Sequence, residues 1–185
     1  MTRSSVVLIL LIPLLGLLSC FARAESVPAA GPEQVQEAPG VNAVVRGIIS
    51  YTRWPVDKPR LGLCIVGETR YGASLHQPVD WFVAEDRLEL LETDPGQIPV
   101  SDCDVVYVGR LGDPEQLRAL IARITGQPVL SIGENEDFCS SGGMFCLERD
   151  GQALRFAVNL DAITRSGLQV NPLVLRLTRQ LLKQP

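Results

Sequence analysis

Apolar residues recur at helical spacing where the globular part of the chain begins. The positions are Val41, Val44, Val45, Ile48 and Ile49. Spacings of three and four residues place them on one face of a helix. A residue before proline avoids helical dihedrals, so the helix must end before Pro55. The pattern predicts a helix from Val41 that packs one face on a core.

Three short runs rich in β-formers come next, each closed by glycine. They read "LGLCIVG" at 61–67, "DVVYVG" at 104–109 and "PVLSIG" at 128–133. Continuous apolar runs of this length are typical of buried strands in a parallel sheet. Between the last two runs, Asp113 and Pro114 fit the cap and first turn of a helix that Gly126 ends. The order strand, helix, strand predicts a right-handed parallel crossover.

The pattern changes after residue 133. "GMFCLER" and "ALRFAVNL" flank Asp150-Gly151, a two-residue hairpin signal that predicts an antiparallel pair. Asn171-Pro172 then predicts the start of a terminal helix. Its expected apolar face is Val174, Leu175, Leu177, Leu181 and Leu182. The predicted fold is α/β, with a mixed, mostly parallel sheet flanked by helices, a C-terminal antiparallel hairpin and a terminal helix.

The first 24 residues have the three-part pattern of a secretory signal peptide. Arg3 precedes an apolar run over 6–18, and "ARA" ends at Ala24. The apolar run is too short to span a bilayer comfortably. An alternative makes "LLSC" a lipoprotein site with Cys20 lipidated, but Leu18 fits that pattern poorly. We expect cleavage after Ala24 and export to the periplasm.

Composition divides and classifies the remaining chain. Residues 25–40 hold prolines, glycines and glutamates without an aromatic residue, which predicts a flexible leader. Residues 41–185 have the length of a single domain. The chain carries a net charge of −4, and cleavage removes two arginines and no acid. No basic block remains, which argues against nucleic acid as a partner.

Candidate catalytic groups are sparse. His76 is the sole histidine and has polar neighbours, so we favour a surface or turn residue over a catalytic one. Glu134, Glu136 and Asp137 cluster in a loop, where solvation is favoured over a metal or acid-base role. The glycine-containing turns lack the spacing of nucleotide-binding motifs. We therefore predict no enzymatic activity, no metal and no cofactor.

Four cysteines follow the predicted cleavage point. Cys139 and Cys146 are separated by six residues, including Gly142 and Gly143, which allow the chain to fold back. A structural disulfide is favoured, with a reactive redox pair and a metal clip as alternatives.

The other two cysteines lie farther apart in the sequence. Cys64 is inside one predicted strand and Cys103 immediately precedes another. Neighbouring parallel strands would bring them together in a disulfide. Two buried thiols are an equal alternative.

"SYTRWP" at 50–55 places Arg53 and Trp54 at the end of the first helix. Aromatic capping of the core, with Arg53 solvated, is the plainer interpretation. The functional one is a pocket in which Arg53 offers a planar donor fork and Trp54 a flat wall. With Gln169 and Asn171 across a cleft, it would bind an anionic or aromatic metabolite.

Phe145 and Cys146 are adjacent in a predicted strand, so their side chains face opposite sides. Burial of Phe145 in the core is favoured because phenylalanine is mostly buried. The alternative is an exposed anchor for a partner protein. Ile163 is the second candidate for partner contact.

Two stretches carry a family resemblance, "GIISYTRWP" and "LRFAVNLDAITRSGLQVNPLVL". They resemble the YfiR family of periplasmic proteins, and the similarity runs from Val41 to the C-terminus. The cysteine spacing in Phe138–Cys146 agrees with it.

The resemblance implies a function that composition and spacing did not supply. YfiR-type proteins are non-enzymatic repressors that bind the periplasmic part of the inner-membrane diguanylate cyclase YfiN and limit cyclic-di-GMP synthesis and biofilm formation. The outer-membrane lipoprotein YfiB relieves repression by sequestering YfiR. An α/β fold, a homodimer and dependence on disulfides, carried over to Cys139 with Cys146 and to Cys64 with Cys103, are implied as well. A small-ligand sensor and a thiol-disulfide enzyme are the rival classes.

Overall fold

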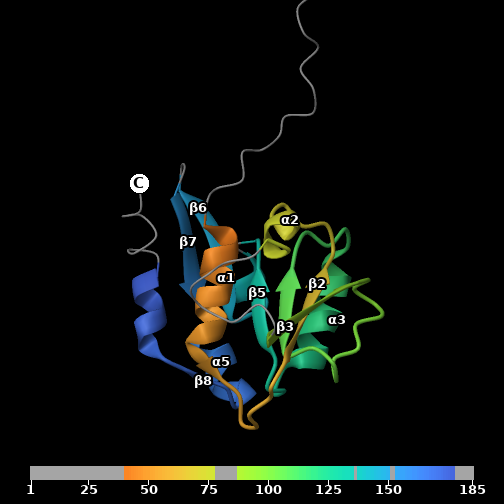
Figure 1. Cartoon of the computed structure of the whole chain (residues 1–185). Helices are drawn as coiled ribbons and strands as arrows, with labels where there is room; N and C mark the ends of the chain where they lie inside the picture. The colour runs from red at the N-terminus through yellow and green to blue at the C-terminus, as the bar shows by residue number, and fades with distance from the viewer. Residues whose placement is uncertain (1–39, 78–86, 136, 151–152, 178–185) are drawn as a thin grey trace, which may run out of the picture. The chain divides into compact units, whose positions relative to one another are not determined.

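The computed structural model describes residues 40–77, 87–135, 137–150 and 153–177 (Figure 1). These residues belong to one unit that begins at Val35. The predicted signal peptide, the leader up to residue 39 and the apolar positions Leu181 and Leu182 lie outside the described residues.

A six-stranded sheet forms the centre of this unit, in the order β3-β2-β4-β5-β6-β7. The strands are β2 (Leu61–Val66), β3 (Leu88–Thr93), β4 (Val105–Val108), β5 (Leu130–Gly133), β6 (Phe145–Asp150) and β7 (Ala153–Val158). Neighbours from β3 to β6 are parallel, and β7 is antiparallel to β6. The mixed, mostly parallel sheet with its antiparallel hairpin is therefore confirmed, whereas β3 was not predicted.

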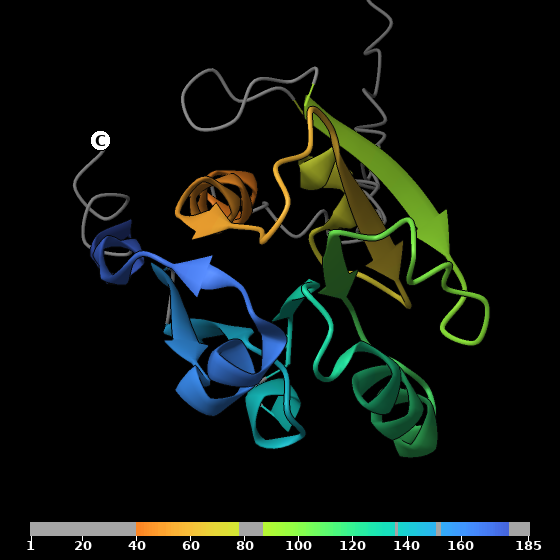
Figure 2. The same cartoon turned by 90° about the horizontal axis from the view of Figure 1, so that it is seen from below.

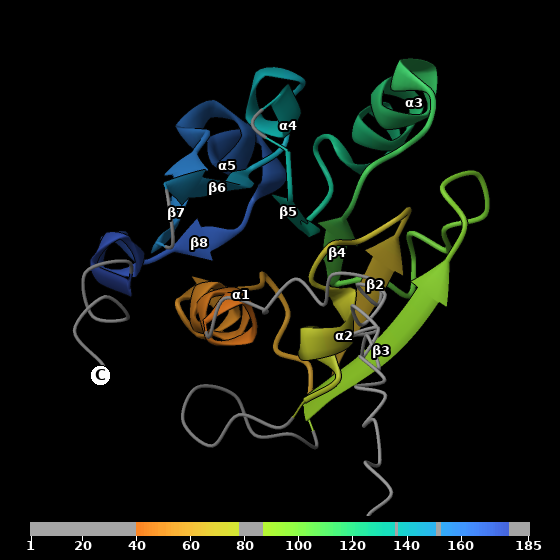
Figure 3. The same cartoon turned by 90° about the horizontal axis from the view of Figure 1, so that it is seen from above.

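Helices cover both faces of the sheet (Figure 3). α1 (Val41–Ser50) and α2 (Gly72–Leu75) lie on one face. α3 (Pro114–Ile124) and α4 (Asp137–Ser140) lie on the other. Helix α5 (Leu160–Ser166) follows the hairpin and was not predicted.

Two separate hydrophobic cores result, because successive side chains of a strand face opposite sides. The α1 core contains Leu63, Tyr107 and Phe145 beneath the apolar residues of α1. The α3 core contains Cys64, Val106 and Cys146 beneath α3 and α4. The predicted opposite facing of Phe145 and Cys146 is thus confirmed. Every residue of 41–49 is buried, so α1 is enclosed on more than the one predicted face.

Both disulfides lie in or against the α3 core. Cys64 of β2 pairs with Cys103, with 5.6 Å between the two Cα atoms, and Cys139 pairs with Cys146, with 5.8 Å between Cα atoms. Cys139 lies in α4, and Cys146 lies in β6. The chain then turns through Gly142, whose φ of 110° favours glycine. Both disulfides therefore cross-link the same face of the sheet.

The crossover unit from β4 to β5 is confirmed in detail. The side chain of Asp113 accepts a hydrogen bond of 2.8 Å from the backbone N–H of Glu115, and Pro114 opens α3. β5 then runs parallel to β4. The predicted hairpin is also present, although Gly151 lies outside the described residues.

The C-terminal element differs from the prediction. Asn171 caps it as expected, but residues Pro172–Arg176 form a 3-10 helix, η2. Val174 and Leu177 are buried, whereas Leu175 is 55% exposed and does not belong to the apolar face. Before η2, the two-residue strands β1 (Thr52–Arg53) and β8 (Gln169–Val170) pair antiparallel, as Figure 2 shows.

Candidate functional site

The end of α1 fixes the backbone on which Arg53 is mounted. The hydroxyl of Ser50 donates to the carbonyl of Gly47, and the hydroxyl of Thr52 donates to that of Ile48, both at 2.8 Å. The Gly47 carbonyl also accepts from the backbone N–H of Tyr51 at 3.1 Å, so the two hydroxyls add to the hydrogen bonds that end the helix. The chain therefore leaves α1 in one defined direction, directly into β1.

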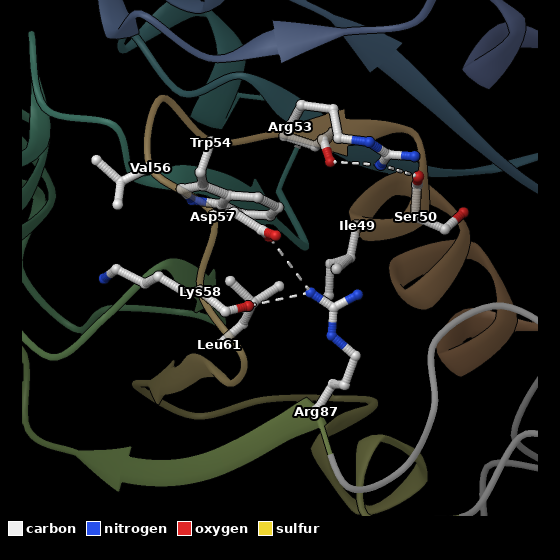
Figure 4. A pocket seen from close by; sticks show the side chains of 10 residues that line it. Ile49, Ser50, Arg53, Trp54, Val56, Asp57, Lys58, Leu61 and Arg87 are labelled. Carbon is white, nitrogen blue, oxygen red and sulfur yellow. Dashed lines mark hydrogen bonds and ion pairs between the residues drawn. The ribbon is translucent and has the colours of Figure 1, made fainter.

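The guanidinium of Arg53 lies against this helix end (Figure 4). Its Nη1 donates to the carbonyl oxygens of Ser50 at 2.6 Å and Thr52 at 2.9 Å. A cation is favoured there because the carboxyl end of a helix carries partial negative charge. Among the hydrogen bonds to described residues, Arg53 uses only Nη1, while its side chain is exposed. The other guanidinium nitrogens of Arg53 are thus available to donate to an anion.

Strand pairing places Arg53 beside the predicted partner residues. Arg53 is directly opposite Gln169 in the β1–β8 pair, and the backbone N–H of Asn171 donates to Tyr51 at 2.9 Å. A cavity of about 480 Å³ is lined by these residues and by Ser50, Val170 and Pro172. The Asn171 side-chain oxygen already accepts from Leu173, so this residue caps η2. The structure brings three of the four predicted ligand residues together.

Trp54 belongs to a second cavity, of about 540 Å³, that also includes Arg53 (Figure 4). Its apolar side is formed by Ile49 and Leu61. At its mouth, Arg87 donates to the carbonyl of Lys58 at 3.1 Å and lies 4.0 Å from the carboxylate of Asp57. Arg53 therefore borders both of these cavities, whereas Trp54 lines the second of them. Sequence reasoning did not identify Arg87, which is distant in the chain.

The indole nitrogen of Trp54 is buried without a hydrogen-bond partner among the described residues. A buried N–H that lacks a partner costs roughly 1–3 kcal/mol, so such groups are uncommon. Trp54 lines the cavity, but its Nε1 is itself buried, so a ligand would reach this N–H only if the ring moved.

The Cys139–Cys146 region is linked to α5 through Asn159. The amide nitrogen of Asn159 donates to the carbonyl of Cys139 at 2.9 Å. Its amide oxygen accepts from the N–H of Ala162 at 3.0 Å, which caps α5. Gly143 packs directly on the ring of Phe138, at a distance that excludes a side chain. The disulfide thus sits within a packed arrangement of α4, β6 and α5.

The two candidate partner residues are less exposed than a protein anchor requires. Phe145 is fully buried, with its ring 5.7 Å from that of Phe156 in an edge-to-face arrangement. It contributes to the α1 core and is not available to a partner in this conformation, which corrects the alternative in which it is exposed. Ile163 is half-buried and packs on the same core. On the same helix, however, Leu160 is 71% exposed.

The remaining polar candidates have ordinary partners. His76 is near Glu92, with 3.0 Å between the ring nitrogen and the carboxylate, and both are exposed. Glu134 accepts from the N–H groups of Arg70 and Tyr71. Within the ranges that the structure describes, which omit Glu136, no group of three or more His, Cys, Asp or Glu could hold a metal ion. In the same ranges, no helix has the length and apolar character that crossing a membrane requires.

Comparison with protein-family models identifies a family for this chain. A model described as YfiR/HmsC-like covers residues 41–179. It begins at the first residue of α1 and includes both disulfides, both cavities at Arg53 and the β1–β8 pair.

Proposed function

The chain belongs to the YfiR/HmsC-like family, and from this membership we propose that it is a periplasmic repressor of a membrane-bound diguanylate cyclase. In this proposal the protein binds the periplasmic part of a YfiN-type cyclase and limits cyclic-di-GMP synthesis and biofilm formation. A YfiB-type outer-membrane lipoprotein relieves repression by competing for it. The family match across 41–179 is the observation that carries the proposal.

Competition between partners requires no chemistry on the protein itself. A lipoprotein that binds the same protein removes it from the cyclase by mass action. The two disulfides support an exported protein, because such bonds persist in oxidising compartments. We propose that residues 1–24 are removed after Ala24 during export, and that the domain of 41–185 acts as a homodimer.

Binding to the cyclase can be measured directly. The mature protein, in its oxidised form, is passed over an immobilised periplasmic domain of the YfiN-type cyclase, and surface plasmon resonance records the affinity. We expect saturable binding that a soluble YfiB-type domain competes away. In cells, deletion of the gene should raise cyclic-di-GMP and surface attachment. Absence of binding together with unchanged cyclic-di-GMP, in a strain that has the cyclase, would overturn the proposal.

The surface of α5 around Leu160 and Ile163 offers a sharper test of where the cyclase binds. Leu160 lies on the same helix and is 71% exposed, so Leu160→Gln changes this surface without opening the core. Val56, at 69% exposed, provides a matched control on another part of the chain. We expect Leu160→Gln to weaken cyclase binding at least fivefold and Val56→Gln to leave it unchanged. Equal effects of both variants would remove α5 from the interface.

A second candidate function is sensing of a small anionic or aromatic metabolite. Its specific support is the exposed Arg53, which lines both cavities and donates only from Nη1 to described residues, with Trp54 in the wall of one cavity. Gln169 and Asn171 lie at the neighbouring cavity. Calorimetry with amino acids and nucleotides tests it, and we expect Arg53→Gln to abolish any binding. A ligand whose affinity is the same with Arg53→Gln would contradict this site.

A further inference from the structure

A third cavity lies at the opposite end of the strands from Arg53, beside Glu134 and Asp137 of the acidic cluster. The parallel strands from β3 to β6 end at the same edge of the sheet. The next strand in the chain after β2 is β3, which lies on one side of β2 in the sheet. The next strand after β4 is β5, which lies in the opposite direction. The point between β2 and β4 is thus a topological switch point, where α/β proteins generally bind their ligands beyond the carboxyl ends of the strands.

The cavity at this edge has a volume of about 590 Å³, within the range of small-molecule sites. It collects residues that follow three different strands. The lining residues used below are Glu68, Arg70, Arg110, Glu134, Asp137 and Arg149. Arginines come from the segment after β2, from the segment after β4 and from β6.

The rim is held in place by backbone contacts. Glu68 and Arg110 exchange two backbone hydrogen bonds, of 3.0 and 2.8 Å, and their side chains form an ion pair at 2.8 Å. Gly109 allows this approach, since a Cβ there would collide with the backbone of Glu68 and Thr69. The segments after β2 and β4 are therefore joined before any ligand binds.

Glu134 pins the loop that carries Arg70. Its carboxylate accepts from the backbone N–H of Arg70 at 2.6 Å and of Tyr71 at 3.0 Å, and from the hydroxyl of Tyr107 at 2.8 Å. Three donors on one carboxylate leave little capacity for a ligand. Glu134 consequently holds the loop in place. The exposed side chain of Arg70 extends from that loop.

Two arginines of the cavity lie against the ring of Tyr71. The guanidinium carbons of Arg70 and Arg149 lie 5.9 and 5.7 Å from the centre of its ring. Arg149 also donates from Nε to the Tyr71 hydroxyl at 3.1 Å. Among the hydrogen bonds to described residues Arg149 uses only Nε, so its two terminal nitrogens keep the fork geometry that matches carboxylate or phosphate. Among the residues the structure describes, neither arginine forms an ion pair.

We propose that this cavity binds a small organic anion, whose carboxylate or phosphate group is held by Arg70 and Arg149. The carboxylate of Asp137 lines the same cavity and would accept a hydrogen bond from a hydroxyl or ammonium group of the ligand. The buried side chain of Leu147 contributes an apolar patch to the lining. The site is separate from Arg53 and Trp54, and it does not depend on the proposed repressor function.

The test uses the oxidised mature protein and three probes at low ionic strength: inorganic phosphate, citrate and L-glutamate. Calorimetry measures affinity, and glycerol serves as the uncharged control. We expect saturable binding of one molecule per chain by phosphate or by a carboxylate probe, which also identifies the chemical class. The double variant Arg70→Gln, Arg149→Gln should lower the affinity at least tenfold. Arg149→Lys alone should have a smaller effect, because it keeps the charge and loses the fork.

Arg118→Gln is the matched control, since Arg118 is an exposed arginine on α3. It should bind like the unaltered protein. Failure of all three probes to saturate, or equal affinity in the double variant and the control, would overturn the proposal.

A measurement on the unaltered protein decides the question if the double variant does not fold. Two-dimensional NMR should show probe-induced shifts at the backbone amides of 68–71 and 134–135, which surround the cavity. Shifts that cluster at 50–54, or that spread over the surface, would overturn the site.

Discussion

Gly143 occupies a position where a Cβ would collide with the ring of Phe138. We predict that Gly143→Ala lowers the free energy of unfolding by about 1–3 kcal/mol, because the ring is buried and cannot move away without displacing α4. Urea denaturation measures the change. Gly112→Ala is the control, since a Cβ at Gly112 meets nothing within 4 Å. Equal stability of the two variants would contradict the close packing.

Glu134 supports a second prediction at the residue scale. We expect Glu134→Gln to lower the free energy of unfolding by about 1–3 kcal/mol, because three donors face a group with only one remaining acceptor oxygen. Glu89→Gln is the matched control: Glu89 is exposed and pairs with the exposed Arg60, a contact worth about 0–1 kcal/mol. Urea denaturation compares them, and a smaller effect at Glu134 than at Glu89 would contradict the pinning role.

At single residues, the sequence predicted some positions but not the contacts that their side chains make. The expected pocket residues Arg53 and Trp54 do lie at cavities, because a helix end and a following proline restrict the local chain. The pattern could not show that Arg53 folds back on its own helix, or that Trp54 faces Arg87. Such contacts depend on rotamers and on segments distant in the chain. Likewise, alternation placed Phe145 and Cys146 on opposite sides of the strand, and the usual burial of phenylalanine favoured the core for the ring.

At the scale of elements, the caps of α3 and α5 allow a direct comparison. Asp113 caps α3 alone, whereas Asn159 caps α5 and also donates to the carbonyl of Cys139. We predict that Asp113→Ala costs about 0.5–2 kcal/mol of the free energy of unfolding. Asn159→Ala should cost more, since it removes a second hydrogen bond. Urea denaturation of both variants measures this difference, and an equal or smaller loss at Asn159 would contradict the linking role.

The elements that the sequence predicted are those with strong periodicity or clear caps. α3 has both, and β2, β4 and β5 are continuous apolar runs. α5 was missed because it buries little beyond Ala162, although Asn159 and the left-handed Gly167 mark its two ends. β1 and β8 are two residues each, too short for any period to appear. Their pairing is a tertiary contact, and it is what brings Arg53 to Gln169.

For the whole molecule, the two disulfides should differ in how much they stabilise the fold. They close segments of different length, with sequence separations of 39 for Cys64–Cys103 and 7 for Cys139–Cys146. In the chain-entropy model these correspond to about 4 and about 2.5 kcal/mol. We predict that the double alanine variant at Cys64 and Cys103 loses more of the free energy of unfolding than the one at Cys139 and Cys146. Urea denaturation without reductant checks the order, and the reverse order would show that native packing outweighs the chain entropy.

The unequal placement of these covalent links has a dynamic consequence. Both support the layer of α3 and α4, whereas the described residues of the α1 layer are held by packing and hydrogen bonds without a disulfide. Reduction should therefore act on the protein asymmetrically. Hydrogen exchange should quicken first in α3 and α4, while the amides of α1 keep their protection until the entire domain opens. Reducing conditions in the envelope would then loosen the α3 and α4 side of the protein first. Arg53 and its cavities lie on the α1 side, which would remain folded.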